Sequence, residues 1–239
     1  MVKMTMSVSI AAAVLGAALL MPSATASATY GASLAKPFMQ CRLTDPMQLR
    51  SISAECAEVS VPESDAEGSR RITLSVARIP AINRRKQTDP IVLLAGGPGQ
   101  GAQLSFTAVS TVFSRTGRQR DIVLLDQRGT GRSNMLSCVT ESRSTAETFA
   151  SDTATFVKLN EKCLEKLRST SDLGAYTTSH AVRDLDAVRA LLGYEKLNFY
   201  AASYGTRVAQ HYARRYPERV RSMVLDGVVA PETVLGPEI

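Results

Sequence analysis

The residues best suited to chemistry lie in the segment YAASYG, residues 200–205, where a short apolar run gives way to a helical pattern. A catalytic serine at a sharp strand-to-helix turn needs small residues two positions before and two positions after it, because larger side chains would collide with neighbouring backbone. Ala201 and Gly205 meet this requirement, although alanine stands where glycine is more usual. The segment therefore predicts a nucleophile elbow with Ser203 at its tip. The alternative is a serine that only caps the following helix.

A glycine-rich turn, AGGPGQG at residues 95–101, follows another apolar run. An oxyanion forms during acyl transfer, and each backbone N–H group that donates to it stabilises it by about 3 kcal/mol. Because Pro98 has no N–H group, we expect Gly97 to supply one donor and Tyr204, the residue after the serine, to supply the other. A phosphate-binding loop is the alternative, but neither glycine fingerprint of nucleotide-binding loops fits these residues. We therefore expect no cofactor.

A third turn, DQRGTGRS at residues 126–133, also follows an apolar run. Asp126 could imitate the acid that binds a ribose in dinucleotide folds, but it lies farther from the glycine turn than the roughly 20 residues of that motif. We expect a structural brace instead, in which Asp126 and Arg128 form hydrogen bonds to nearby backbone.

Catalysis by Ser203 would also require a base that is oriented by an acid. His211 lies in the helix after the serine, about 12 Å along it, which is too far for a direct hydrogen bond. His180 precedes the elbow and is expected to be a surface or capping residue rather than an unorthodox base. Asp226 ends a later apolar run and is the candidate acid, but no histidine follows it.

A sheet of short apolar strands must position these turns, since each turn follows such a run. Continuous apolar runs are typical of parallel strands covered on both faces, whereas the period-two pattern at residues 71–80 predicts a half-buried strand near a sheet edge. Helical patterns lie between them at residues 181–192, with Thr178 or Ser179 as a cap, and at 204–216. This alternation predicts an α/β fold, a mostly parallel sheet with flanking helices, whose ligand crevice lies at the carboxyl ends of the strands. The apolar strands are expected at residues 91–94, 122–125, 197–201 and 223–225.

The composition fits a globular chain of one domain or slightly more, with 239 residues, 44% hydrophobic and 21% charged. The formal charge is +6, from 28 Lys and Arg against 22 Asp and Glu. The basic residues are scattered, and their longest cluster is residues 84–86. This distribution indicates solubility and weak attraction to anionic surfaces rather than a nucleic-acid-binding stripe. We expect no nucleic-acid partner.

Residues 1–28 have the three-part plan of a secretory signal peptide: one charge at Lys3, an apolar run at residues 10–21, and a small-residue string before Thr29. A membrane anchor is the alternative, but a spanning helix needs about 20 apolar residues. We expect cleavage, no stable membrane insertion afterwards, and export to the periplasm or the medium of a bacterium. Residues 29–239 then form the folded core.

Four cysteines, an even number, favour two disulfides in an oxidising compartment. We favour the sequential pairs Cys41 with Cys56 and Cys138 with Cys163, each stapling an irregular segment beside the core. Four cysteines allow three pairings, so the others stay open. No C-x-x-C spacing is present, and a metal site is therefore not expected.

The GGPG turn, DQRGTGRS, AASYGT and LDGVV, the last at residues 225–229, together resemble the proline iminopeptidase and tripeptidyl aminopeptidase family of α/β-hydrolases, in its exported bacterial branch. The resemblance runs from about Cys41 to the C-terminus. It implies a serine peptidase that releases residues or short peptides from substrate N-termini, with Ser203 as nucleophile and Gly97 and Tyr204 lining the oxyanion hole. Ala95 departs from the histidine that many relatives carry there, which bears on turn geometry rather than mechanism.

The resemblance also implies that the triad aspartate and histidine come from later strands, beyond Ile239, and that Asp226 is mostly architectural. We therefore expect the N-terminal portion of a hydrolase, inactive alone, for which a missing C-terminal half is a candidate partner. A peptide or a small ester or amide is the expected substrate. A noncatalytic remnant or binding module that retains the fold, and an exported esterase or lipase, are the alternatives.

Overall fold

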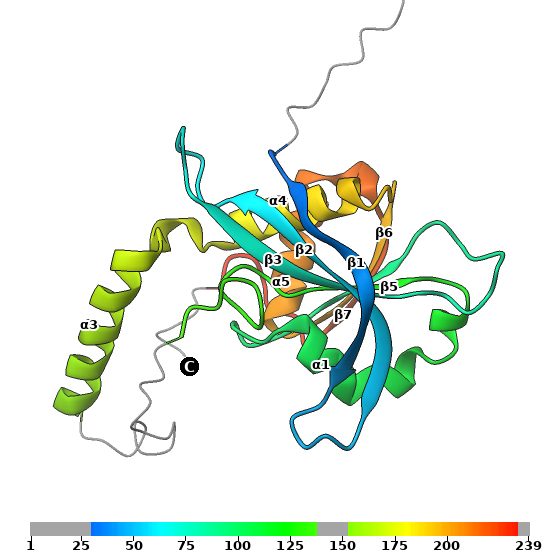
Figure 1. Cartoon of the computed structure of the whole chain (residues 1–239), viewed down its shortest axis with the longest axis horizontal. Coiled ribbons are helices and arrows are strands. Elements are labelled where there is room, and N and C mark those ends of the chain that lie inside the picture. The colour runs from blue at the N-terminus through cyan, green and yellow to red at the C-terminus, as the bar shows by residue number, and fades with distance from the viewer. Residues whose placement is uncertain (1–29, 138–152, 234–239) are drawn as a thin grey trace, which may run out of the picture.

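The computed structural model describes residues 30–137 and 153–233. Its strands form one sheet in the order β1-β2-β3-β5-β4-β6-β7 (Figure 1). Strands β4, β5, β6 and β7 pair in parallel, while β1, β2 and β3 add antiparallel strands beside β5. The bounds are β1 Ser33–Thr44, β2 Ser51–Pro62, β3 Arg71–Ile79, β4 Ile91–Leu94, β5 Ile122–Leu125, β6 Leu197–Ala202 and β7 Val220–Asp226.

The parallel half of the sheet confirms the predicted α/β architecture. Every residue of β4 and β5 is buried, as expected for short apolar strands covered on both faces. Strand β7 differs, because most of its residues are exposed and Val224 is 56% exposed. Only its pairing with β6 is present among the described residues.

Strands β1 and β2 of the antiparallel half were not foreseen in the sequence. Strand β3, predicted near a sheet edge, has β1 and β2 beyond it. A disulfide joins Cys41 of β1 to Cys56 of β2, so this bridge links two regular strands and not the irregular segments that we expected. Cys163 is also disulfide-bonded, but Cys138 lies outside the described residues, as does the expected leader.

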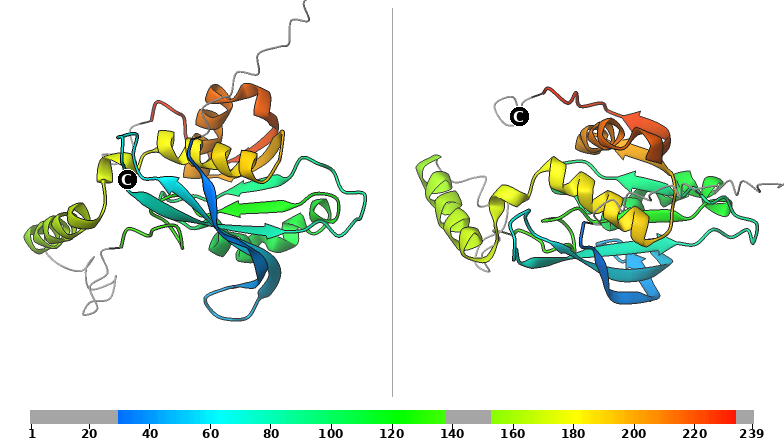
Figure 2. Two further views of the ribbon diagram at one scale, coloured as in Figure 1. Left: turned by 45° about the horizontal axis from the view of Figure 1, so that its top comes forward. Right: turned by 90° about the horizontal axis from the view of Figure 1, so that it is seen from above.

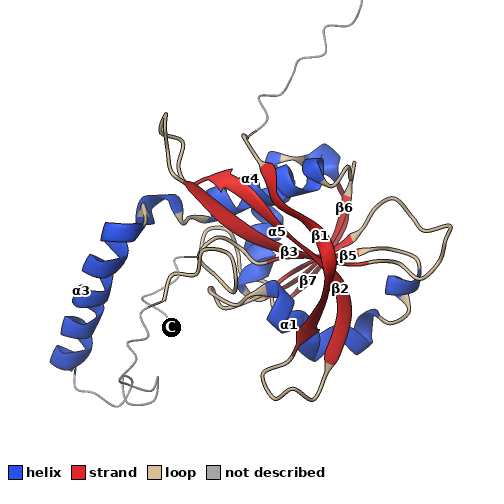
Figure 3. Ribbon diagram, viewed as in Figure 1, coloured by secondary structure: helices blue, strands red, loops and turns tan. Residues whose placement is uncertain are grey.

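Helices cover both faces of the sheet (Figures 2 and 3). Residues from α4 and α5 join one buried cluster with the sheet, and residues from α1 join another. The predicted helix at 181–192 begins earlier, with Thr177 as its cap in place of Thr178 or Ser179. The helices are α1 Ala102–Val109, α3 Thr153–Thr170, α4 Thr178–Leu191 and α5 Tyr204–Arg215, with 3₁₀ turns η1 Ser110–Phe113, η2 Thr116–Arg118, η3 Leu173–Ala175 and η4 Pro217–Arg219.

None of the helices in the described part of the chain combines the length and the apolar character that crossing a bilayer requires.

Candidate active site

Ser203 occupies a sharp turn at the carboxyl edge of the sheet. Strand β6 ends at Ala202 and α5 begins at Tyr204, so the serine alone connects them. Its backbone angles are φ 51° and ψ −124°, a conformation that costs a non-glycine residue on the order of 1–3 kcal/mol. The residue is exposed. A strained and exposed serine between a strand and a helix is the geometry of a nucleophile elbow.

The small residues around the serine have the steric role that the sequence suggested. A Cβ atom on Gly205 would lie 2.3 Å from the carbonyl oxygen of Leu94, so only glycine fits there. Ala201 is fully buried between β4 and β7, opposite Leu94 and Leu225. Alanine therefore satisfies the packing requirement at the position where glycine is more usual.

The glycine turn after β4 directly faces the serine. A Cβ atom on Gly96 would lie 3.0 Å from the Cβ atom of Ser203. Gly97 has φ +101°, in the region that favours glycine, and no turn hydrogen bond between described residues uses its amide. Tyr204 is the first residue of α5, and the first amides of a helix have no intrahelical acceptor. Gly97 directly follows Gly96, and Tyr204 directly follows Ser203, so the two residues expected to donate adjoin the two that meet.

Asp226 supports the elbow through its backbone. Its carbonyl oxygen accepts a hydrogen bond of 2.8 Å from the amide of Ser203. Its carboxylate accepts a hydrogen bond of 2.8 Å from the hydroxyl of Tyr200, and this bond, aided by burial, raises the pKa of Tyr200. No hydrogen bond or ion pair in the described part of the chain joins Asp226 to a histidine.

Neither histidine serves as a base for Ser203 in this structure. The Nδ1 atom of His180 lies 2.9 Å from Oγ1 of Thr177, in the cap of α4, and its Nε2 atom lies 4.0 Å from Asp65. His211, in α5, has a buried Nε2 atom without a partner among the described residues. Burial, followed by nearby arginines, lowers the pKa of both histidines. No hydrogen bond of the described residues joins either histidine to Ser203.

Asp126 braces the glycine turn, in the role that the sequence predicted for it. One carboxylate oxygen accepts the amide of Gln103 and the other the amide of Arg132, each at 3.0 Å. A Cβ atom on Gly131 would lie 2.3 Å from this carboxylate, so the loop after β5 closes tightly around it. Burial raises the pKa of Asp126, although the backbone amides oppose the shift. The carboxylate thereby links the start of α1 to the loop after β5.

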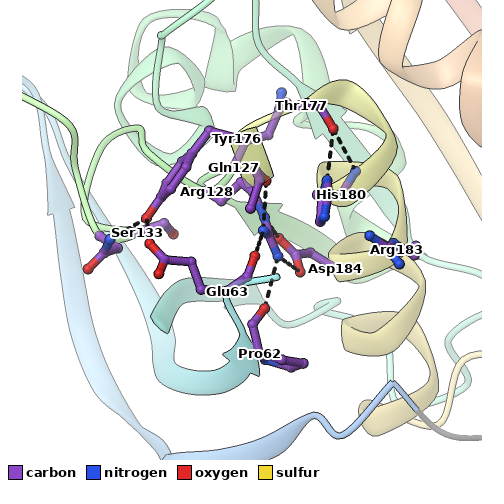
Figure 4. Close-up of polar contacts among 12 residues, drawn as sticks. Pro62, Glu63, Gln127, Arg128, Ser133, Tyr176, Thr177, His180, Arg183 and Asp184 are labelled. Carbon is purple, nitrogen blue, oxygen red and sulfur yellow. Dashed lines mark hydrogen bonds and ion pairs between the residues drawn. The ribbon is translucent and has the colours of Figure 1, made fainter. Parts of the chain in front are cut away.

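Arg128 forms the centre of a buried polar cluster near the same edge (Figure 4). It forms two hydrogen bonds of 2.7 and 2.8 Å with Asp184 of α4. Its remaining donors reach the backbone carbonyls of Glu63 and Ala175, at 2.6 and 2.9 Å, and the hydroxyl of Tyr30. Arg128 thus ties the end of β2, the loop after β5, η3 and the middle of α4 together.

Sequence reasoning identified Arg128 as a brace but missed its partner. Asp184 is 1% exposed and lies among the apolar residues Val182, Leu185 and Val188 on the buried side of α4. A carboxylate on an apolar helix stripe was the available signal, because a buried charge requires a partner. Helix α4 also contacts the elbow, since Thr178 Oγ1 lies 2.7 Å from the hydroxyl of Tyr204.

Comparisons with known proteins identify a family and several relatives of this chain. The family model described as alpha/beta hydrolase fold matches residues 89–238. The tripeptidyl aminopeptidase of Streptomyces coelicolor is 34% identical over 193 residues, which are 74% of this chain and 35% of that protein. The serine protease Hip1 of Mycobacterium tuberculosis is 31% identical over 208 residues, covering 80% and 39% of the two chains.

Two further matches are to an esterase and to a solved structure. Carboxylesterase B of Mycobacterium tuberculosis is 32% identical over 226 residues, 86% of this chain and 42% of that protein. The crystal structure of a proline iminopeptidase from Mycobacterium smegmatis has a TM-score of 0.42 at 18% identity, and the match covers 70% of this chain and 42% of that one. The matched part of this chain therefore spans 35–42% of the length of these proteins.

Proposed function

Because this chain belongs to the α/β-hydrolase fold family, we propose that it is a serine hydrolase that cleaves peptides near their N-termini through an acyl-enzyme. The observation that carries the proposal is the strained, exposed Ser203 facing the glycine turn at Gly96. Relatives named tripeptidyl aminopeptidase and serine protease support peptides as the substrate class.

The proposed reaction proceeds in two steps. The Ser203 hydroxyl oxygen attacks the carbonyl carbon of the scissile bond and gives its proton to a base. The amides of Gly97 and Tyr204 stabilise the oxyanion that forms. The leaving amine takes the proton, and an acyl-serine remains. Water then attacks that ester, releases the acyl product and returns the proton to Ser203.

The proposal requires a base that the described residues do not provide. Neither His180 nor His211 reaches Ser203, and without a base the rate falls by on the order of 10⁴-fold or more. We propose that another segment, in the same polypeptide or in a second polypeptide, supplies the base and the acid that orients it. The chain alone is then inactive, or nearly so.

Export is a further part of the proposal. The disulfide between Cys41 and Cys56 supports it, because such bonds persist in oxidising compartments. The expected signal peptide at residues 1–28 would direct the chain there. The mature protein would act in the periplasm or outside the cell.

Labelling with a fluorophosphonate probe tests the role of Ser203. The probe is applied to the 239-residue chain and to a version extended by any coding sequence found downstream. We expect labelling to depend on Ser203 and to increase greatly in the extended version. Ser203→Ala should abolish it, whereas Ser179→Ala, at another exposed serine on α4, should not. Labelling that survives Ser203→Ala, or that is absent from both versions, would reject the proposal in favour of a noncatalytic module.

An esterase is the second candidate, supported by the relative named carboxylesterase B. Substrates that share one acyl group separate the two functions. A peptidase should hydrolyse tripeptide arylamides with a free N-terminus and lose most activity when that terminus is acetylated. Hydrolysis confined to simple esters, with no effect of the free amine, would instead identify an esterase.

A further inference from the structure

The two loops at the amino ends of β4 and β5 form one surface. The first is the β3–β4 connection, residues 80–90, and the second contains η1 and η2 before β5. The amide of Asn83 donates to the carbonyl of Arg118 at 2.9 Å, and the amide of Gln87 donates to that of Gln119 at 2.8 Å. The β3–β4 loop projects at the right of Figure 1, beside the η1–η2 segment. Basic residues separated in the sequence thereby come together.

This surface carries positive charge that the described residues do not neutralise. Its two neighbouring carboxylates already have cationic partners: Asp121 binds Lys86, and Asp89 binds both Arg120 and Arg221. Four arginines of the same loops are exposed and form no ion pair within the described ranges. They are Arg84, Arg85, Arg115 and Arg118. With Lys86 and Arg120 the two loops contain six basic residues against two acidic ones, Asp89 and Asp121, which gives them a net charge of +4.

An exposed aliphatic side chain accompanies these charges. Ile82 is 75% exposed and lies in the β3–β4 loop, two residues before Arg84. A soluble polyanion would interact with the arginines but would leave Ile82 in water. A bilayer with anionic headgroups suits both, because the hydrocarbon begins just beneath the charged layer. The combination favours a lipid surface over a soluble polymer.

We propose that Ile82, Arg84, Arg85, Arg115 and Arg118, here called the basic face, bind the surface of an anionic phospholipid bilayer. Binding is peripheral and electrostatic, with Ile82 inserted at the headgroup boundary. The charge is concentrated enough to provide affinity, since each cationic side chain near such a membrane contributes about fivefold. The binding is independent of the proposed catalytic activity.

The basic face lies at the opposite end of the sheet from Ser203. Strand β4 follows the basic loop at its amino end and leads into the glycine turn at its carboxyl end. A molecule bound through the basic face therefore presents Ser203 and Gly97 away from the bilayer. Access of a soluble substrate to the elbow is retained in the bound state.

Sedimentation with vesicles tests this proposal. The protein is used from Thr29 onward, because the apolar run at residues 10–21 would bind lipid by itself. We expect binding to vesicles of equal parts phosphatidylglycerol and phosphatidylcholine, none to pure phosphatidylcholine, and steep weakening as salt is added. Equal binding to both vesicle types, or binding to neither, would overturn the proposal.

Charge-reversal variants locate the binding surface. Arg84→Glu with Arg85→Glu, and separately Arg115→Glu with Arg118→Glu, should each weaken vesicle binding by at least about 25-fold. The control is Lys162→Glu with Lys166→Glu on α3, which makes the same change of net charge at exposed positions. An equal loss in the control would mean that only net charge matters and would reject the basic face. Circular dichroism spectra and melting temperatures verify that each variant is folded.

The Ile82→Asn variant distinguishes lipid from a soluble polyanion. It should weaken vesicle binding by about three- to tenfold, because the inserted side chain is lost, and leave binding to soluble polyphosphate unchanged. If Ile82→Asn has no effect on vesicle binding and polyphosphate binds as tightly as vesicles, the surface recognises polyanions and the lipid proposal is wrong.

Discussion

Arg128 and Asp184 form an ion pair from which water is excluded, with both side chains 1% exposed. The two residues are 56 positions apart and come from the loop after β5 and from α4. Because both charges are buried away from water, each is stabilised mainly by the opposite charge of the other. The pair therefore fixes α4, whose first residue, Thr178, contacts Tyr204 at the elbow.

Asp184→Asn is expected to destabilise the protein by about 3–5 kcal/mol, because it leaves the Arg128 guanidinium buried without its counter-charge. Urea denaturation measures this change. Asp65→Asn is the matched control, since Asp65 pairs with Arg183 but is 62% exposed, and such surface pairs contribute about 0–1 kcal/mol. Replacing both partners, Arg128→Met with Asp184→Leu, should restore part of the loss. Similar small effects of Asp184→Asn and Asp65→Asn would show that the buried pair is not needed.

Gly205→Ala is expected to destabilise the fold by more than about 3 kcal/mol or to prevent folding, because the added methyl would overlap the carbonyl of Leu94. Backbone cannot move aside as a flexible side chain can. Gly174→Ala is the control, since its nearest contact would be 3.4 Å from Asp172 at an ordinary φ; its effect should stay within about 1 kcal/mol. Thermal unfolding compares the two. Equal stability of both variants would contradict the steric account of the elbow.

The elbow could be predicted from the sequence because its determinants are local. The apolar run before Ser203, the helical pattern after it and the small residues Ala201 and Gly205 all lie within a few positions. The same holds for the parallel strands, whose apolar runs are continuous. Such local patterns predict strands and helices well, because the apolar residues that form the pattern are the ones that the folded protein buries.

The features that the sequence did not reveal depend on distant pairings. Strand β1 is an exposed edge strand, so it lacks the apolar alternation that would have identified it. The ion pair between Arg128 and Asp184 joins two segments that no local pattern connects. The cap of α4 shifted by one residue to Thr177, within the usual uncertainty of helix ends. The basic face likewise appears only when the β3–β4 loop packs on η2.

Reducing the Cys41–Cys56 disulfide is expected to destabilise the protein by about 3 kcal/mol, the value for a closed loop of about 15 residues. The main cause is the greater freedom of the unfolded chain. Cys41→Ser with Cys56→Ser should lower the urea midpoint, and reductant should have a smaller additional effect on this variant than on the parent. A variant as stable as the parent would show that pairing of β1 with β2 alone holds this edge.

Stability is expected to decrease as the pH falls from about 7 to 5, in part because of His211. Burial, together with Arg207 and Arg214, lowers the pKa of this histidine in the folded state below its ordinary 6.5. Well above pH 6.5, His211 is neutral in both the folded and the unfolded state, so its contribution to the free energy of unfolding is constant. Below 6.5 the unfolded chain binds the proton first, so protonation favours unfolding until the folded-state pKa is passed.

His211→Gln removes this titration and should reduce the dependence of unfolding free energy on pH between 7 and 5, as measured by urea denaturation at several pH values. The parent and the variant should run parallel above pH 7, where neither titrates at this site, and this range is the internal control. Part of the dependence of unfolding free energy on pH should remain in the variant, because the pKa of His180 is also lowered. A variant with the full slope of the parent would contradict the assignment, because the buried Nε2 atom of His211 has no partner among the described residues that would favour the charged ring.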